Sequence, residues 1–594
     1  MTPLLLLLAV SCGSSNDDTS PIDDGKTRLT ILHTNDWQSH MMGWGPNAEY
    51  TPESIDDDTT VGGIARMKTL IDEIRGSSTN PVALYDAGDW MAGALFQLLA
   101  TSDAAELQMM GALGYDAITL GNHEFDWGPQ VLGEMISRAN DLGVDVPIVA
   151  ANTHPNPDDS GDDTLEAHFD SGRITATNIH EIDGITIGVF GLLGDDAQAI
   201  TPAVVPASFS EAQVAAEAAV AELEAAGVDI VVAITHAGTG PDAELAEAVD
   251  GIDVIVGGHS HTALFEEIHS DGVVIVQAGA YTRYLGQLDL VQADNGDWEI
   301  EQYQLHELND STVGDSEINS VVEGFVASLE AGPLADLGYE FDTPIASIES
   351  DVAMSACSES GLGDFVSDAF RQQLTAVDPE NPIDVAIESQ GVIRDNFVAG
   401  VTGMESFSDF FRVMPLGFGT DDVPGYSLVH FYMNGSEVAD ACEVTVSISP
   451  DYGCDYYIQI SGMRCTVDMS KSQFNRVVGV ELQTDTGWEE IDITRHNPEL
   501  YHIGVDSYVA SLMYILEGLT FGGIIVEPKD ENGDPLPNQA DWIFDRDPDT
   551  DGVQEIKLWE ALVGYAETFS DTTGDGVPDI EGYTEGETRI FGFE

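Results

Sequence analysis

The chain has 594 residues, of which 43% are hydrophobic, so we expect at least two domains with packed cores. Its 106 acidic residues against 19 Lys and Arg give a net charge of −87, which argues against nucleic-acid polymers and anionic membrane surfaces as partners. The acidity fits a saline habitat, because at 1 M salt the Debye length falls to about 3 Å and the repulsion between surface charges is screened. It fits equally an acidic surface that keeps an exported protein soluble.

The N-terminus has the features of an export signal. The apolar run Leu4–Val10 is far shorter than the roughly 20 residues of a membrane span, and it resembles a signal-peptide core without the usual preceding Lys or Arg. Cys12 follows as in a bacterial lipobox, so residues 1–12 are interpreted as a signal with a lipidation site and 13–27 as a tether. A plain secretory signal or a misplaced start codon are the alternatives. We expect a periplasmic or cell-surface protein whose only membrane contact is a lipid at Cys12.

Short apolar strands alternate with helical stretches between residues 28 and 310. This alternation predicts an α/β domain with packed sheets. The predicted strands are Leu29–His33, Val82–Asp86, Ala117–Leu120, Ile148–Ala151, Ile185–Phe190, Ile230–Thr235, Val254–Gly257 and Val273–Gln277. The predicted helices are Gly62–Arg75, Asp103–Leu113 and Ser210–Ala226.

A second pattern follows a linker region at residues 311–340, so we expect a second domain at 341–594. Its predicted elements are the helix Gly363–Leu374 and the strands Tyr426–Met433, Tyr456–Ile460 and Val477–Leu482. Four cysteines fall in this half, and an even number in an exported protein predicts one or two disulfides with the pairing left open. They are Cys357, Cys442, Cys454 and Cys465.

Five segments of the first half place Asp, Asn or His directly after a predicted strand. They are His33-Thr-Asn-Asp-Trp-Gln38, Ala87-Gly-Asp89, Gly121-Asn-His-Glu-Phe-Asp126, Thr235-His-Ala-Gly238 and Gly257-Gly-His-Ser-His261. Ligands of α/β sheets bind at the carboxyl ends of the strands, so these five ends can converge on one site. One such segment alone is more often a capped turn or a buried core histidine. Five in order make coincidence a poor explanation and predict a metal site, and this ligand set suits divalent Mn, Fe, Co or Zn.

These segments resemble the signature of the calcineurin-like metallophosphoesterases. The strings at 32–36 and 121–126 are similar to the bacterial 5′-nucleotidase/UDP-sugar hydrolase family in particular. In the second half, Ser389-Gln-Gly-Val-Ile-Arg394 and Val413-Met-Pro-Leu-Gly417 are similar to that family's motifs. The resemblance implies an α/β fold: a two-sheet metallophosphoesterase sandwich flanked by helices, then an α/β (α+β) 5′-nucleotidase-type substrate domain.

The resemblance also implies roles for individual residues. Asp89 would bridge two metals about 3.5–4 Å apart. The other implied metal ligands are Asp36, Gln38 and His261 for one ion, and Asn122, His236 and His259 for the other. His123 would stabilise charge or protonate the leaving group, with Asp126 orienting its ring.

The sequence departs from the family pattern at three places. Gln38 stands where the family has His, and His40, two residues on, is the alternative ligand. In the second domain, Arg394 can grip a phosphate or carboxylate, while Ser389 replaces the family's Asn. The family's two base-stacking aromatic residues correspond to Leu416 and Tyr508 here, so we expect little discrimination among bases.

Two Asp-rich tail segments, 547–552 and 571–579, resemble calcium loops. The first has the 1-3-5 spacing with Gly at position 6, but Leu558 stands where an EF-hand has Glu. Calcium binding there is one interpretation, and chance in an Asp-rich chain is the other.

The sequence therefore predicts a two-metal hydrolase of phosphate esters, with nucleoside 5′-monophosphates or related nucleotides as its small-molecule substrates. The alternatives within the enzyme class are a cyclic phosphodiesterase, a broad phosphomonoesterase and a UDP-sugar hydrolase. A surface binding protein that keeps the fold without turnover is the alternative outside it.

Overall fold

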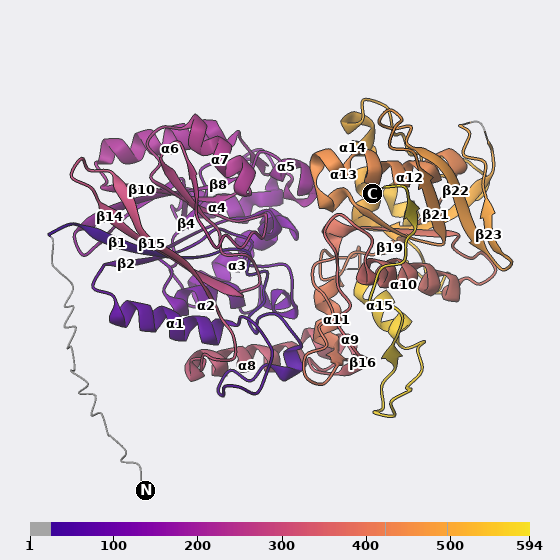
Figure 1. Cartoon of the computed structure of the whole chain (residues 1–594), viewed down its shortest axis with the longest axis horizontal. Coiled ribbons are helices and arrows are strands. Elements are labelled where there is room, and N and C mark those ends of the chain that lie inside the picture. Colours follow the sequence, from indigo (N-terminus) through magenta and orange to yellow (C-terminus); the bar gives the residue numbers. More distant parts are fainter. Residues whose placement is uncertain (1–24, 422, 496, 594) are drawn as a thin grey trace, which may run out of the picture.

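A computed structural model describes residues 25–421, 423–495 and 497–593. Two lobes follow one another along the chain and lie side by side (Figure 1). The predicted signal at 1–12, with Cys12, and most of the predicted tether lie outside the described residues. Within the described ranges, no helix is both long and apolar enough to cross a membrane.

Two β-sheets form the centre of the first lobe. In spatial order, the larger contains β15 (Trp298–Glu307), β14 (Tyr284–Gln292), β1 (Arg28–Thr34), β2 (Val82–Asp86), β3 (Ala117–Thr119), β4 (Ile148–Val149) and β6 (Ile174–Thr175). The smaller contains β12 (Ile268–Ser270), β13 (Val273–Val276), β11 (Val254–Gly257), β10 (Ile230–His236), β8 (Ile185–Leu193) and β7 (Thr177–Ile182). Buried β-branched side chains of both sheets, such as Ile31, Val189 and Val232, share one core cluster. The two sheets therefore pack face to face, as predicted.

Helices cover the outer faces of this sandwich. Apolar residues of α1 (Ile64–Ser77), α2 (Ala105–Leu113) and α3 (Gly128–Asp141) pack with the larger sheet. Those of α6 (Ala212–Ala226) and α7 (Thr239–Ala248) pack with the smaller one. The α/β class and the two-sheet sandwich flanked by helices that were predicted for this half are confirmed.

The predicted strands of the first half all form; β8 continues three residues beyond its predicted end, to Leu193, and β4 is two residues shorter than predicted. This strand ends at Val149 rather than Ala151, because the chain leaves the sheet there. Ala150 N still bonds Thr175 O of the same sheet, at 2.8 Å, but Ala151 N bonds Gly191 O of the other sheet, also at 2.8 Å.

Parallel pairing brings the chemically important strand ends together. β1, β2 and β3 run parallel, with Thr34 opposite Asp86, and β10 runs parallel to β8 and β11. The segments that follow β1, β2, β3, β10 and β11 therefore leave their sheets at carboxyl ends, which is where the site lies.

Two helices make up most of residues 311–340, the segment predicted as a linker. Asp315 directly precedes α8 (Ser316–Ala331), and its side chain accepts hydrogen bonds from the backbone N–H groups of Glu317 and Ile318. α8 contacts α1 and the 3₁₀ helix η2 (Leu95–Leu99), and Phe325 and Leu329 are buried. α9 (Pro333–Leu337) follows.

The second lobe combines three small sheets with helices. In spatial order, the first sheet contains β19 (Leu428–Asn434), β24 (Leu500–Asp506), β17 (Val385–Ser389) and β20 (Ile458–Ser461). The second contains β23 (Gly487–Glu490), β22 (Val477–Thr484), β21 (Met463–Val467) and β26 (Ile590–Phe591). The third contains β18 (Met404–Ser406), β16 (Pro344–Ile348) and β25 (Asp579–Ile580). The main helices are α10 (Gly361–Val377), α11 (Phe407–Val413), α12 (Gly435–Ser447), α14 (Ser507–Leu519) and α15 (Leu558–Ala566). This mixed α/β lobe is the second domain that the sequence predicts.

All four cysteines of this lobe are paired, as Cys357–Cys454 and Cys442–Cys465. The prediction of one or two disulfides is confirmed, and the structure supplies the pairing that the sequence left open.

Candidate metal centre and substrate site

The strand ends of the first lobe hold several side chains in an uncommon backbone conformation. Five residues of the predicted ligand set have positive φ values between 45° and 75°, which non-glycine residues rarely adopt. They are Asp36, Gln38, Asp89, His259 and His261. Clustered left-handed residues are typical of functional sites, where the surrounding fold offsets the local strain.

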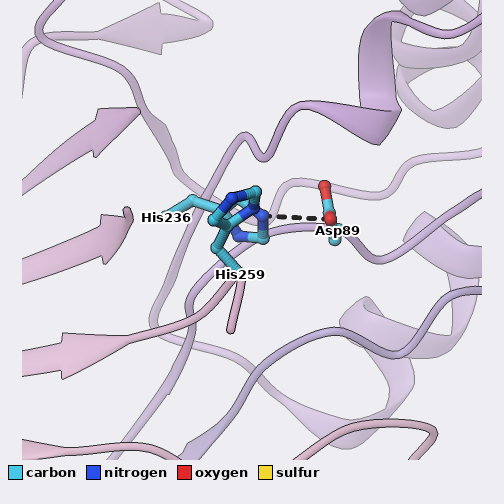
Figure 2. Close-up of side chains that lie close together, drawn as sticks. All are labelled: Asp89, His236 and His259. Carbon is cyan, nitrogen blue, oxygen red and sulfur yellow. Dashed lines mark ion pairs between the residues drawn. The ribbon is translucent and has the colours of Figure 1, made fainter. Parts of the chain in front are cut away.

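Three side chains at the centre of this region could hold a metal ion. Asp89, His236 and His259 each offer a ligand atom, and these atoms all lie within 4.8 Å of one another. Figure 2 shows the two imidazoles close together, facing the carboxylate, and their ring centroids are 5.1 Å apart. His236 Nε2 lies 3.0 Å from Asp89 Oδ2, and the His236 side chain is fully buried.

Further predicted ligands adjoin this group. Asp36 Oδ1 lies 3.3 Å from His261 Nε2 and 3.9 Å from His236 Nε2. Asn122 Oδ1 lies 3.0 Å from His259 Nδ1. The structure thus brings together residues from five separate strand ends.

The donor set fits divalent cations. Within the described part of the chain, the buried atoms Asp36 Oδ1 and His236 Nε2 make no well-aligned hydrogen bond, so both are free to coordinate an ion. Burial would lower the pKa of His236, but Asp89 and then Asp36 outweigh it and raise this pKa to about 10. Such a strongly negative local potential attracts cations, and the mixture of carboxylate, imidazole and amide suits transition metals.

Glu124 supports the centre, and the sequence analysis gave it no role. Its buried carboxylate accepts hydrogen bonds from Asp89 N at 2.9 Å, Gly121 N at 2.6 Å and Met91 N at 3.1 Å. These bonds fix the turns that carry Asp89 and Asn122. Its only signal in the sequence was its place between His123 and Asp126.

His123 and Asp126 form a pair beside the metal-capable group. His123 belongs to the 3₁₀ helix η3 (His123–Phe125), and its Nδ1 lies 2.7 Å from Asp126 Oδ2. Its Nε2 lies 4.0 Å from Asp89 Oδ2, on the side of the centre. Burial lowers the pKa of His123, but the charges of Asp126 and Asp89 raise it above its ordinary value. The ring can therefore carry a proton beside the centre.

The amide of Gln38 lies between the two lobes. Gln38 Nε2 lies 3.0 Å from His261 Nε2, and Gln38 Oε1 accepts a hydrogen bond from Arg394 Nη2 at 3.1 Å. His40 is engaged elsewhere, with Nδ1 at 2.7 Å from Gln38 O and Nε2 at 3.3 Å from Asp395 Oδ2. Of the two candidates left open by the sequence, Gln38 is the one beside His261.

The four residues predicted to bind substrate have different surroundings. Arg394 reaches the first lobe, whereas the hydroxyl of Ser389 donates to Asp455 O within the second lobe. Leu416 is buried, at 5% exposure. Tyr508 donates from its hydroxyl to Ile200 O of the first lobe, over 3.0 Å.

Tyr508 already has an aromatic partner, which the sequence analysis missed. The ring of Tyr426 stacks on it, with centroids 5.3 Å apart and an interplanar angle of 20°. Burial and then the charge of Asp126 raise the pKa of both tyrosines. The stack therefore lies near Asp126.

Two groups of side chains among the described residues lie close enough together to hold an ion, and neither includes a residue of the Asp-rich tail segments. The second group consists of Asp57, Asp58 and Asp310, of which Asp58 and Asp310 pair with Arg66. In the tail, Asp579 accepts hydrogen bonds from Thr572 N and Thr573 N of its own segment.

Comparisons with known proteins agree with this geometry. A family model for calcineurin-like phosphoesterases matches residues 29–263, and one for the 5′-nucleotidase C-terminal domain matches residues 341–511. The chain thus combines a calcineurin-like phosphoesterase domain with a 5′-nucleotidase C-terminal domain. Both matches indicate a metal-dependent hydrolase of phosphate esters, which is the enzyme class that the sequence predicts.

Individual relatives extend over most of the chain. It is 29% identical over 527 residues to the trifunctional nucleotide phosphoesterase protein YfkN of Bacillus subtilis, covering 84% of this chain and 33% of YfkN. The chain thus spans about a third of the length of that relative. It is 26% identical to the 5′-nucleotidase of Mus musculus, covering 81% and 82% of the two chains. The structure of a 5′-nucleotidase precursor from Thermus thermophilus shares the fold, with a TM-score of 0.71, 22% identity and coverage of 95% and 99%.

Proposed function

We propose that this protein hydrolyses phosphate esters at a two-metal centre, with nucleoside 5′-monophosphates or related nucleotides as substrates. The observation that carries the proposal is the convergence of Asp89, His236 and His259 beside the His123–Asp126 pair. The relatives named as nucleotide phosphoesterases and 5′-nucleotidases support the substrate class.

The metal-holding roles follow from the contacts. Asp89 would contact both ions, with His236, His259 and Asn122 around one of them. Asp36 and His261 would hold the other, with Gln38 at its edge. We propose Mn, Zn, Co or Fe, because these ions accept carboxylate, imidazole and amide ligands together. Divalent ions at this position supply positive charge to the phosphoryl oxygens and lower the pKa of an attacking water.

The remaining steps fall to the protein's own side chains. His123 would hold a proton at Nε2 and give it to the leaving oxygen, while Asp126 fixes the ring through Nδ1. Arg394 would grip the phosphate through its planar guanidinium, since its Nη2 already lies at the Gln38 edge of the centre. Tyr508 is stacked on Tyr426, so base recognition would be weak.

We also propose that the protein is exported. Two disulfides support an oxidising compartment, which the periplasm and the cell surface both provide. The lipid anchor at Cys12 remains a prediction from the sequence.

A metal-supplemented hydrolysis panel tests the proposed function. The purified protein is stripped with a chelator, dialysed and then assayed with Mn, Co or Zn on nucleoside monophosphates, UDP-sugars and cyclic nucleotides. We expect metal-dependent release of phosphate from the monophosphates. Faster turnover of cyclic nucleotides or UDP-sugars would identify one of the alternative enzymes, and no turnover with any metal would favour a binding protein.

A further inference from the structure

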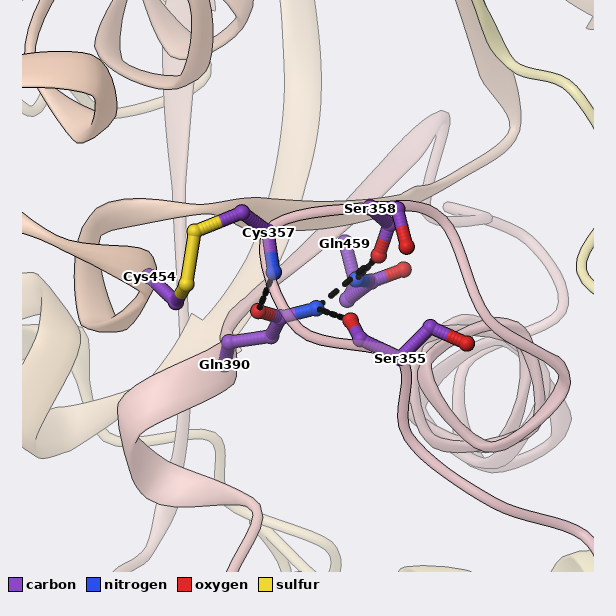
Figure 3. The surroundings of a disulfide bond; sticks show 6 residues. All are labelled: Ser355, Cys357, Ser358, Gln390, Cys454 and Gln459. Carbon is purple, nitrogen blue, oxygen red and sulfur yellow. Dashed lines mark hydrogen bonds between the residues drawn. A yellow bond between two sulfur atoms is a disulfide. The ribbon is translucent and has the colours of Figure 1, made fainter. Parts of the chain in front are cut away.

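A single amide side chain holds the segment that leads to Arg394. Gln390 opens the 3₁₀ helix η6 (Gln390–Val392), and its amide faces the loop at residues 355–358 (Figure 3). Oε1 accepts from Cys357 N at 3.1 Å, and Nε2 donates to Ser355 O at 2.7 Å and to Ser358 O at 2.9 Å. Both amide hydrogens and the amide oxygen are thus used on one loop.

A second loop, residues 454–457, contacts the same segment. Gln390 N donates to Tyr457 O at 2.9 Å, and the hydroxyl of Ser389 donates to Asp455 O. Gly391 permits this close approach, because a Cβ at that position would lie 2.9 Å from the Cβ of Asp455. The segment 389–391 is therefore held by both loops.

The Cys357–Cys454 disulfide joins these two loops to each other, with a Cα–Cα distance of 4.6 Å. Cys357 is exposed and Cys454 is partly exposed. The other disulfide, Cys442–Cys465, differs because both of its cysteines are completely buried. A reductant in solution can therefore reach the first disulfide more readily than the second.

The position of Arg394 depends on the segment held in this way. Its Nη1 donates to Gly391 O at 3.0 Å, while its Nη2 donates to Gln38 Oε1 in the first lobe. If Gly391 shifted, the guanidinium would lose one of the two contacts that fix its plane.

We propose that Gln390 and the Cys357–Cys454 disulfide form a clip that positions Arg394 for the phosphate group of the substrate. This inference rests on the proposed function, and it makes Gln390 a positioning residue that acts through Arg394. Loss of the clip should weaken phosphate capture and leave the metal centre and the proton donor in place. The expected signature is a higher KM with an almost unchanged kcat.

The first test replaces Gln390 with Met, which is similar in length and makes none of the three hydrogen bonds. The KM for AMP is expected to rise roughly tenfold, equivalent to about 1.4 kcal/mol of binding, with kcat within about threefold. Gln459→Met is the matched control, because the Gln459 side chain donates to the same Ser358 O from outside the segment 389–391. Its KM should stay within about twofold of the wild type.

The second test removes the disulfide from the full-length protein without a substitution. A phosphine reductant and iodoacetamide are applied under native conditions, both reagents are removed, and Mn is restored before the assay. Peptide mapping must show alkylation at Cys357 and Cys454. We expect the same rise in KM with unchanged metal content, and a roughly tenfold weaker affinity for inorganic phosphate by calorimetry, which needs no turnover.

The outcomes separate the two proposals. Untreated protein that hydrolyses no phosphate ester with any metal would contradict the proposed function, while the calorimetric measurement still tests the clip. An unchanged phosphate affinity and KM in both Gln390→Met and the alkylated protein would overturn the clip.

Discussion

Arg394 in the second lobe donates a hydrogen bond from Nη2 to Oε1 of Gln38 in the first lobe, over 3.1 Å. The same amide lies 3.0 Å from the ring of His261 through its Nε2. One side chain thus touches both the phosphate-gripping guanidinium and a proposed metal ligand. A half-turn of the amide would place Oε1 on the side of His261, where it could coordinate an ion, and would break the bond with Arg394. Metal coordination by Oε1 and the bond to Arg394 therefore exclude each other.

Replacing Gln38 with His tests this competition. Imidazole is a stronger ligand than an amide for transition metals, so metal binding should tighten in chelator competition. The bond to Arg394 should be lost at the same time, which raises the KM for nucleotides. Gln38→Ala is the control, since it should raise KM without tightening the metal. Unchanged metal affinity in Gln38→His would show that this side chain does not face the ion.

Asp89→Asn is expected to abolish phosphatase activity and lower the bound metal measured by elemental analysis. The reason is that one carboxylate is proposed to contact both ions, and an amide carries no negative charge. Asp196→Asn is a suitable control, because this exposed residue lies 3.9 Å from His259 and outside the metal-capable group. Full turnover by Asp89→Asn would exclude the bridging role.

His123→Ala should lower kcat by roughly 10²–10⁴, because it removes the proposed proton donor. Metal content should be unchanged, since the Nδ1 of this ring is bound to Asp126 and not to the centre. Asp126→Asn should give a smaller loss of kcat. If His123→Ala instead lost metal, His123 would have to be reassigned as a ligand.

Substrate selectivity should depend little on the base. A base stacked on an aromatic side chain gains roughly 1–3 kcal/mol, but Tyr508 already stacks on Tyr426 and Leu416 offers no aromatic face. We expect kcat/KM values for AMP, GMP, UMP and CMP within about tenfold of one another. A preference of roughly a hundredfold for one base would reveal a pocket that opens when the tyrosines separate.

Stability should fall on acidification because of a partly buried histidine pair in the second lobe. His430 Nδ1 lies 2.8 Å from His502 Nε2, and burial followed by the charge of His502 lowers the pKa of His430 to about 4. Unfolded histidine titrates near 6.5, so between about pH 6.5 and 4 the unfolded chain binds a proton that the folded chain excludes. His430 alone should therefore lower the free energy of unfolding by at most about 1.4 kcal/mol per pH unit in that range.

Chemical denaturation of His430→Gln and wild type at several pH values measures this contribution. The variant should lose less stability than the wild type on going from about pH 7 to about pH 4. His269→Gln is the control, because His269 is exposed. Parallel stability curves for His430→Gln and the wild type would contradict the prediction.

Much of the first lobe was predictable because its signals are local. A buried strand followed at once by Asp, Asn or His can be recognised in a few residues, and parallel pairing then brings such ends together. Contacts between the lobes were not predictable in this way. The bonds from Tyr508 to Ile200 and from His40 to Asp395 join residues 308 and 355 positions apart, far outside any local pattern. These contacts depend on how the two folded domains pack against each other.

The Cys357–Cys454 disulfide also affects the unfolded chain. Its cysteines are 97 positions apart, whereas those of Cys442–Cys465 are 23 apart. In the loop-entropy treatment, closing loops of these lengths removes unfolded-state freedom worth about 4.7 and about 3.4 kcal/mol, respectively. The longer loop contains α10, β17, α11, β19 and α12. Much of the second lobe would therefore fold while its chain is closed into a loop by this disulfide. Reduction of Cys357–Cys454 would enlarge the set of unfolded conformations from which the lobe must refold.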